Sequence, residues 1–299
     1  MVGSSADRCF IEKTSCVLTL LSLSISSSSQ RIAETCWEDG IHYELLRCTG
    51  DDPSTVSERI LQANSRSDVD GILIFYPIFA QPVTDRGPYK NRLTGVYYKT
   101  NDDYLRDLVD PIKDVEGLCG DYNARWLFRA GNKPTDDRVV PCTALSVKLI
   151  LDHYHIAPSW NGQIVSVVNR SEIMGRPLAA MLASEGAIVY SIDVDSILQF
   201  RPGGRLRRCT SAEINLEWCL QQSSVVVTGV PSFDFQIPAE AIAPGTTVVN
   251  VSEFTNVCED TLLDRPGVKY IPQVGKVTVA VLEHNLLRLH RKAQRRVER

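Results

Sequence analysis

The chain has 299 residues, of which 43% are hydrophobic, a formal net charge of −4 and a pI near 5.8. This length can bury one large core or two modest ones, and we expect two α/β domains, residues 1–140 and 141–299. The slight negative charge argues against nucleic acid as a main partner, and no apolar run is long enough to cross a membrane. The nine cysteines lack paired spacing and a neighbouring histidine cluster, which predicts reduced thiols in a cytoplasmic protein without a bound metal.

The first part of the chain alternates apolar runs with helical patterns. The run VLTLLSLSI, which begins at Val17, predicts a buried first strand, because a continuous apolar run of this length suits a strand covered on both faces. The same run loosely resembles a secretory signal, but Asp7 and Glu12 stand where such a signal carries basic residues. Beyond it, the patterns predict helices over residues 33–39, 54–63 and 103–108, and strands over 42–47 and 71–75.

Residues 165–195 have the pattern strand, turn, helix, strand, which is typical of the first half of a dinucleotide-binding unit. Pro177 suits the first position of the helix and Gly186 the residue just past its end. The second strand ends on Asp193, which lies 22 residues after Ser171. At about this spacing an acid accepts both ribose hydroxyls of NAD and repels a 2′-phosphate. The pattern therefore predicts NAD as the cofactor.

The turn in this unit, from Asn169 to Gly175, lacks the motif G-x-G-x-x-G. Arg170 and Ser171 are candidates to donate hydrogen bonds to a pyrophosphate, because the N-terminus of a helix already favours an anion. The alternative is an exposed turn in which Ser171 only caps the helix. Units with this strand, turn, helix and strand pattern also occur in sheets that bind no dinucleotide. The turn by itself therefore leaves both interpretations open.

The rest of the chain continues the alternation. Residues 143–153 predict a helix that joins the two domains, and the runs SVVVTGV and TTVVNVS predict two further strands. The last helix has apolar residues at helical spacing from Thr278 onward and ends in basic residues, which we interpret as a solvated tail. The alternation implies a parallel, doubly wound sheet. We expect the last helix to cross back to the first domain, and substrate and cofactor to meet in the cleft between the domains.

Five motifs, in this order, resemble the methylenetetrahydrofolate dehydrogenases: PIKDVEG (111–117), PCT (141–143), VVNRSEIMGRPLAAMLASEGA (167–187), VTGVPS (227–232) and IPQVGKVT (271–278). Asn-Arg-Ser in the cofactor loop and the strand end SIDVD are most similar to the monofunctional, NAD-dependent branch found in fungi. The resemblance implies an N-terminal α/β folate-binding domain, a Rossmann-like domain and a final helix that crosses back. It also implies a homodimer that oxidises 5,10-methylenetetrahydrofolate to 5,10-methenyltetrahydrofolate by hydride transfer to NAD.

The resemblance places the pterin-contacting acid at Glu116, where relatives more often carry aspartate. Oxidation of a methylene bridge between two nitrogens needs little acid–base help, so a carboxylate here would orient the pterin and stabilise the developing positive charge. Asp114 is expected to support the loop, although both acids would also fit an exposed turn before Gly117. Cys142 is a candidate catalytic group, with a small packed thiol as the alternative, and Thr143 is a candidate cap of the following helix.

Cofactor contacts are expected where strands of the second domain end and where the last helix begins. The backbone after a buried strand can pass close to the nicotinamide ribose, and glycine permits that approach. Lys276 is either a solvent-facing cation or a contact for the carboxylate tail of the folate. The predicted cofactor-binding residues are Asn169, Arg170, Ser171, Gly175, Asp193, Thr228, Gly229, Val230, Gly275 and Thr278.

The chain departs from the bifunctional members of this family. Their cyclohydrolase step uses a lysine in a Tyr-x-x-x-Lys helix and a glutamine beside a proline, and these positions hold Ser28, Ile32 and Phe75 here. Without a polar pair to activate water, we expect no cyclohydrolase activity. The tyrosine of that helix ordinarily stacks on the folate, so its replacement keeps open an NAD-binding protein without turnover. An NADP-dependent bifunctional enzyme is a further alternative that Asp193 disfavours.

A second departure is an insertion at residues 81–100, where relatives pass quickly from strand to helix. A loop of this length without structure of its own is uncommon. It is either a product of imperfect intron removal or a lid over the folate site.

Overall fold

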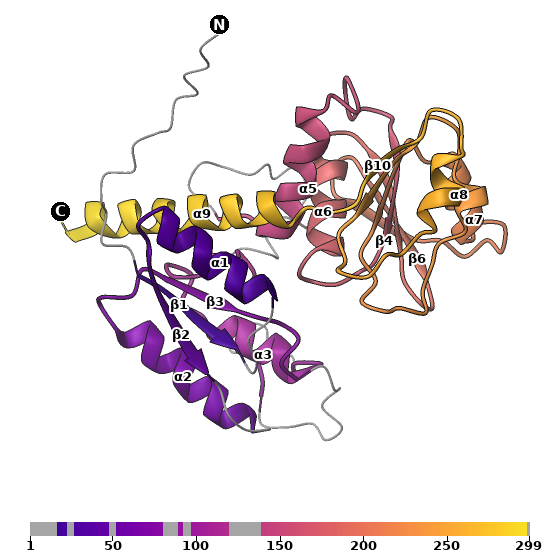
Figure 1. Ribbon diagram of the computed structural model, residues 1–299. Coiled ribbons are helices and arrows are strands. Elements are labelled where there is room, and N and C mark those ends of the chain that lie inside the picture. The colour runs from indigo at the N-terminus through magenta and orange to yellow at the C-terminus, as the bar shows by residue number, and fades with distance from the viewer. Residues whose placement is uncertain are drawn as a thin grey trace, which may run out of the picture.

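One parallel sheet and one mostly parallel sheet, each covered by helices on both faces, make up the computed structural model (Figure 1). The structure describes residues 17–22, 27–47, 52–79, 89–91, 97–119 and 139–297. The predicted α/β class with two domains is therefore confirmed. The position of the boundary, after residue 140, stays a prediction.

The first sheet has three parallel strands in the order β2-β1-β3. Its elements are β1 (Val17–Ser22), α1 (Ser27–Glu38), β2 (His42–Arg47), α2 (Pro53–Ser65), β3 (Gly71–Ile74) and α3 (Asn101–Leu108). Helices α2 and α3 cover one face, and α1 covers the other (Figure 1). Helix α2 begins where the sequence directs it, because Asp52 accepts a hydrogen bond from the N–H of Ser54 and Pro53 follows the cap.

The second sheet has seven strands in the order β10-β9-β8-β4-β5-β6-β7. The strands are β4 (Ile164–Val168), β5 (Ile188–Ile192), β6 (Ile197–Arg201), β7 (Arg205–Arg208), β8 (Val225–Thr228), β9 (Thr247–Asn250) and β10 (Lys269–Ile271). The helices of this unit are α5 (Cys142–His153), α6 (Gly175–Ser184), α7 (Leu216–Gln222) and α8 (Glu259–Leu263), with a short turn of 3₁₀ helix, η2 (Ala239–Ala241).

Helices α5 and α6 pack on one face of this sheet, and α7, α8 and η2 pack on the other, so the sheet is doubly wound as predicted. The strands from β10 to β5 run parallel. Beyond them, β6 and β7 form an antiparallel hairpin that the sequence analysis did not predict. All four residues of β7, RLRR, are exposed, so this edge strand has no apolar face that a pattern could reveal.

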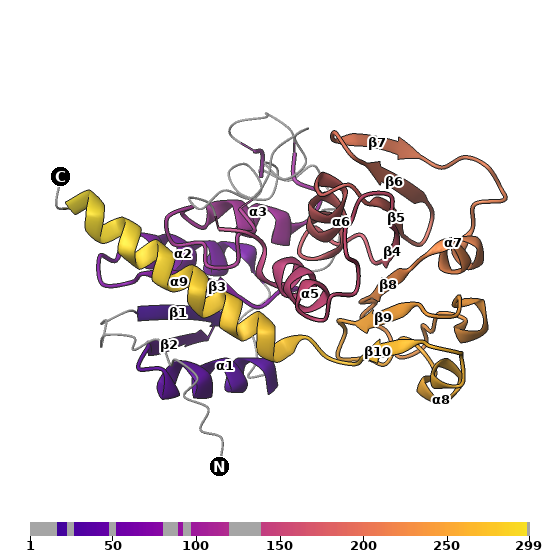
Figure 2. The same cartoon turned by 90° about the horizontal axis from the view of Figure 1, so that it is seen from above.

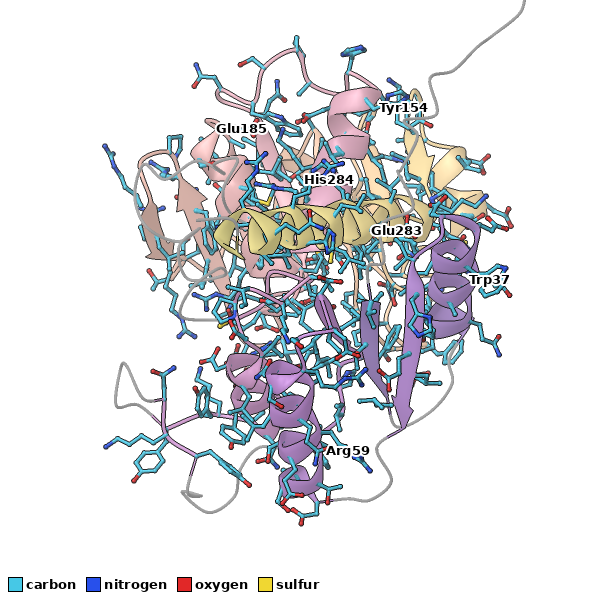
Figure 3. The ribbon with its side chains drawn as sticks, turned by 90° about the vertical axis from the view of Figure 1, so that its left-hand side faces the viewer. Trp37, Arg59, Tyr154, Glu185, Glu283 and His284 are labelled. Atoms are coloured by element: carbon cyan, nitrogen blue, oxygen red, sulfur yellow. The ribbon has the colours of Figure 1, made fainter. Side chains whose placement is uncertain are left out.

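Helix α9 (Gly275–Val297) starts at the second unit and crosses back over the first sheet, as predicted (Figures 1 and 2). Its residues Leu282, Leu286 and Leu289 are buried in the same core as Leu18 and Leu73 of the first sheet. In Figure 3 it lies beside α1, whose Trp37 points outward and is 85% exposed. Of the helices that the structure describes, none is long and apolar enough to cross a bilayer.

Local predictions hold to within a few residues. Strand β2 has the predicted bounds, whereas the helix expected from residue 33 begins at residue 27. Pro177 is the third residue of α6 and not the first, because a turn over residues 172–174 precedes the helix. Gly186 follows the end of α6 with a φ of +114°, a conformation in which glycine avoids steric strain.

The insertion lies partly outside the described residues, at 81–88 and 92–96. Its described residues contact α3. The ring of Tyr89 stacks on Tyr104 with centroids 4.0 Å apart, and the side-chain amide of Asn91 donates to Asp107 at 2.9 Å. These contacts test neither the intron hypothesis nor the lid.

Candidate active site

A cleft of about 580 Å³ lies between the two units. From the first unit it is lined by the end of β3, part of α1 and the loop after α3, and from the second by the ends of β9 and β10 and the start of α9. The lining residues used below are Ile32, Phe75, Tyr76, Glu116, Cys142, Thr143, Asn250, Gly275 and Thr278.

Glu116 brings a carboxyl group into the wall of this cleft. One carboxyl oxygen, Oε2, accepts a hydrogen bond from the backbone N–H of Ile74 at 3.3 Å, which ties the loop to the end of β3. Burial raises the pKa of this carboxyl to about 8, and repulsion from Asp114 adds to the rise. In the ligand-free protein the neutral form of Glu116 is therefore favoured at neutral pH, whereas a neighbouring positive charge would favour the ionised form.

Asp114 holds the loop that carries Glu116. Its carboxylate accepts hydrogen bonds from the backbone N–H groups of Glu116 at 3.1 Å, Gly117 at 2.9 Å and Cys119 at 2.7 Å. Asp114 is only 4% exposed, which excludes the exposed turn considered as an alternative. Gly117 has a φ of +68° and its α-carbon faces the backbone of Val140 so closely that a Cβ would lie 2.8 Å from the carbonyl carbon.

A residue of the last helix clamps the same loop from the other side. The side-chain amide of Asn285 donates to the carbonyl oxygens of Val115 at 2.9 Å and Val140 at 3.3 Å. Asn285 is buried on the apolar face of α9. Sequence analysis did not identify it, although a polar residue within an apolar helix face is a signal that could have done so.

Cys142 stands at the junction of the two units, where its backbone N–H donates to the carbonyl oxygen of Glu116 at 3.3 Å. Its side chain is buried, and burial raises the pKa of the thiol well above its ordinary value, with Glu116 and Asp114 adding to the rise. The thiolate that a nucleophile needs is therefore disfavoured. The geometry favours a packed thiol over the catalytic role considered for Cys142. Thr143 lines the cleft, and α5 has no side-chain hydrogen bond at its cap.

The cofactor loop is held by its own side chains. Asn169 accepts a hydrogen bond from the N–H of Ser171 and donates to the carbonyl oxygen of Gly229, which joins the ends of β4 and β8. The hydroxyl oxygen of Ser171 accepts from the N–H of Met174 at 3.2 Å, so this side chain caps the turn before α6. A Cβ on Gly175 would lie 1.8 Å from the carbonyl oxygen of Asn169, so only glycine fits there.

The side chain of Arg170 lies against residues at and after the end of β5, and its contact with a pyrophosphate stays a prediction. Its guanidinium donates to the carbonyl oxygens of Ser191, at 2.7 Å, and Ser196. Its Nη1 also lies 3.7 Å from Oδ2 of Asp193. The Asp193 side chain follows β5 and is 43% exposed, so its carboxylate remains open to a ligand while Arg170 is held by its neighbours.

Asn256 organises the predicted nicotinamide-side segment. Its side-chain oxygen accepts from the hydroxyl of Thr228 at 3.1 Å and from the N–H of Val230 at 2.8 Å, and its amide donates back to the carbonyl oxygen of Val230. Thr228 is fully buried, backbone and side chain alike, whereas Gly229 and Val230 are partly exposed and can reach a cofactor. Nothing in the local sequence distinguishes Asn256, because its partners lie more than 20 residues away.

Residues 141–294 match the family model of the tetrahydrofolate dehydrogenase/cyclohydrolase NAD(P)-binding domain. The methylenetetrahydrofolate dehydrogenase [NAD(+)] of Dictyostelium discoideum is 37% identical over 269 residues, which are 85% of this chain and 78% of that protein. The enzyme of the same name from Saccharomyces cerevisiae is 34% identical over 276 residues, with the same shares of 85% and 78%. The chain belongs to this family.

The solved structure of the NAD-dependent 5,10-methylenetetrahydrofolate dehydrogenase from S. cerevisiae superposes with a TM-score of 0.75 at 31% identity and covers 93% of this chain and 88% of that one. A dehydrogenase-cyclohydrolase from Trypanosoma brucei has the same fold, with a TM-score of 0.70 at 19% identity and shares of 94% and 88%. The resemblance inferred from the motifs is thereby confirmed.

The family's cyclohydrolase positions are apolar here. Ile32 of α1 and Phe75 after β3 both line the cleft, and neither can polarise a water molecule. Ser28 lies in the first turn of α1, and its side chain is outside the described residues.

NAD fits the second wall of the cleft. The side-chain oxygen of Asn250, at the end of β9, is buried without a hydrogen-bond partner, and a buried acceptor of this kind suits a ligand donor. Gly275 and Thr278, in the first turn of α9, line the same cleft. The Thr278 hydroxyl donates to the carbonyl oxygen of Val274 at 3.2 Å. Asp193 is not among the residues that line this cleft; its carboxylate is partly exposed, and its contact with a ribose stays a prediction.

Proposed function

We propose that this protein oxidises 5,10-methylenetetrahydrofolate to 5,10-methenyltetrahydrofolate with NAD and has no cyclohydrolase activity. The observation that carries the proposal is the carboxyl of Glu116 in the wall of a cleft whose opposite side carries the family's cofactor loop. NAD supplies the hydride acceptor when it is bound.

The residues of the chain position the reactants and balance charge. A lone pair on a substrate nitrogen expels the hydride, and the product is a resonance-stabilised cation. Glu116 lies in the cleft wall beside that cation; the developing positive charge lowers the raised pKa of its carboxyl, which releases its proton to solvent. Asp114 and Asn285 fix the loop from both sides, so the carboxyl does not have to be ordered during the reaction.

The preference for NAD over NADP follows from Asp193, just after β5, and Arg170, whose side chain lies beside it. The Asp193 carboxylate accepts hydrogen bonds from ribose hydroxyls and repels a 2′-phosphate, while the hydrogen bonds of Arg170 to Ser191 and Ser196 keep its guanidinium from binding that phosphate. Cyclohydrolase activity is excluded from the proposal because Ile32 and Phe75 leave no polar pair in the wall.

The test is methenyltetrahydrofolate formation by the purified chain, with NAD and NADP compared side by side. We expect turnover with NAD, little with NADP, and hydrolysis of added methenyltetrahydrofolate no faster than in buffer. Preference for NADP or rapid hydrolysis would contradict the proposal. Binding of NAD without turnover would instead support the alternative of an inactive NAD-binding protein, which the replacement of the family's tyrosine by Ser28 suggested.

We further propose, from the family resemblance, a homodimer that works in the cytoplasm with the tetrahydrofolate substrate as its small-molecule partner. Light scattering of the purified chain tests the dimer, and imaging of a fluorescent fusion tests the location. A monomeric mass or an organellar signal would overturn the corresponding statement.

A further inference from the structure

Tyr76 follows strand β3 and lines the folate side of the cleft together with Glu116. Its ring packs against the apolar cluster that includes Ile72 and Ile74, and the guanidinium of Arg106 lies 5.9 Å from the ring centroid. The ring is therefore fixed from the side of α3.

The hydroxyl of Tyr76 is buried and has no hydrogen-bond partner. A buried polar group left unpaired costs about 1–3 kcal/mol, so native proteins keep such groups rarely and usually for a reason. In the described part of the chain, only two side-chain atoms of this kind belong to residues that line the cleft. One belongs to Tyr76, a lining residue of the folate side, and the other to Asn250, a lining residue of the cofactor side.

The surroundings of the hydroxyl keep its proton in place. Burial raises the pKa of the phenol well above its ordinary value, and the negative charge of Glu116 adds the next largest contribution. Arg106 opposes this rise, while Asp114 and Asp102 support it. A phenol that stays protonated is available as a hydrogen-bond donor at neutral pH.

We propose that the Tyr76 hydroxyl is a substrate-binding group, which donates a hydrogen bond to an acceptor atom of the pterin ring that Glu116 contacts. The flat heterocycle offers ring nitrogens and a carbonyl oxygen as acceptors, so one bound pterin can satisfy a donor and a carboxyl that lie in the same wall. This inference rests on the proposed function, because it takes the folate as the ligand of this side of the cleft.

The test is Tyr76→Phe, which removes the hydroxyl and keeps the ring. We expect the KM for methylenetetrahydrofolate to rise about tenfold, as loss of one hydrogen bond of about 1.4 kcal/mol implies, with little change in the KM for NAD. Because the hydroxyl has no partner in the ligand-free protein, the variant should unfold at the same temperature as the parent or a higher one.

Tyr190→Phe is the matched control. The hydroxyl of Tyr190 accepts a hydrogen bond from Nε2 of Gln199 at 2.7 Å, so this variant should lose stability and keep its KM for the folate. A loss of stability in Tyr76→Phe with an unchanged KM for the folate would overturn the proposal, since the hydroxyl would then be satisfied within the protein or by a trapped water.

A parent protein without turnover would contradict the proposed function and leave the role of Tyr76 measurable. Calorimetric titration with tetrahydrofolate decides that case. Weaker binding by Tyr76→Phe than by the parent supports the proposal. Equal binding by the two proteins overturns it, and so does the absence of binding by the parent.

Discussion

Replacing Glu116 with glutamine removes a titrating group and keeps the hydrogen-bond acceptor that Ile74 uses. The folded protein holds the pKa of this carboxyl at about 8, against an ordinary value of 4.5 for glutamate. The native state therefore binds the proton more tightly than the unfolded chain. The stability that this proton contributes is fully present below pH 4.5 and is lost as the pH rises through about 8.

The size of the effect follows from the same two pKa values. One pKa unit corresponds to about 1.36 kcal/mol, so ionising Glu116 costs roughly 5 kcal/mol of folding free energy once the pH exceeds 8. Glu116→Gln cannot ionise at this position. Its free energy of unfolding should therefore change less than that of the parent between about pH 5 and about pH 9. At the alkaline end the variant should be the more stable protein.

Urea unfolding followed by tryptophan fluorescence, repeated across this pH range, measures the difference. Glu58→Gln, on an exposed turn of α2, is the control and should follow the parent at every pH. A constant difference in unfolding free energy between Glu116→Gln and the parent across the range would refute the assignment of a raised pKa to Glu116. The same ionisation should give kcat/KM an ascending limb near pH 8, which the glutamine variant lacks.

Three further substitutions test the rest of the site. Gly175→Ala forces a Cβ against the carbonyl oxygen of Asn169, so it should cost about 1–3 kcal/mol in thermal unfolding and weaken NAD binding in a fluorescence titration. Asp193→Ser should lower kcat/KM with NAD roughly tenfold and raise it with NADP, because the substitution removes both the ribose acceptor and the negative charge that repels a 2′-phosphate. Cys142→Ala should retain kcat in the steady-state assay, since the buried thiol is not ionised, and an inactive but folded variant would restore the nucleophile hypothesis.

The sequence predicted elements where a repeating pattern controls the structure. Strands such as β8 are buried on both faces, and their continuous apolar runs are therefore visible in the sequence and predict them. The hairpin of β6 and β7 escaped prediction because an exposed edge has no such pattern. The loop motifs indicated the cofactor-binding unit, but they could not show that the guanidinium of Arg170 donates to the backbone of Ser191 and Ser196 and lies near Asp193.

Other groups of the site are defined by single long-range contacts. Asn285 lies 145 residues from one of its hydrogen-bond partners and 170 from the other, and the partnerless hydroxyl of Tyr76 is a property of packing alone. Neither a local pattern nor a propensity encodes such a contact, so both residues became visible only in three dimensions.

The path of α9 has a consequence for how the chain is made. The ribosome releases the first sheet early, but the leucines that close its core, Leu282, Leu286 and Leu289, are among the last residues to be synthesised. Until they emerge, the apolar surface around Leu18 and Leu73 is covered only in part, by α1, and the folate side of the cleft lacks Asn285 as well. The half of the protein that is translated first is thus the half that finishes folding last, and a nascent chain stalled before α9 would present this partly uncovered surface to chaperones.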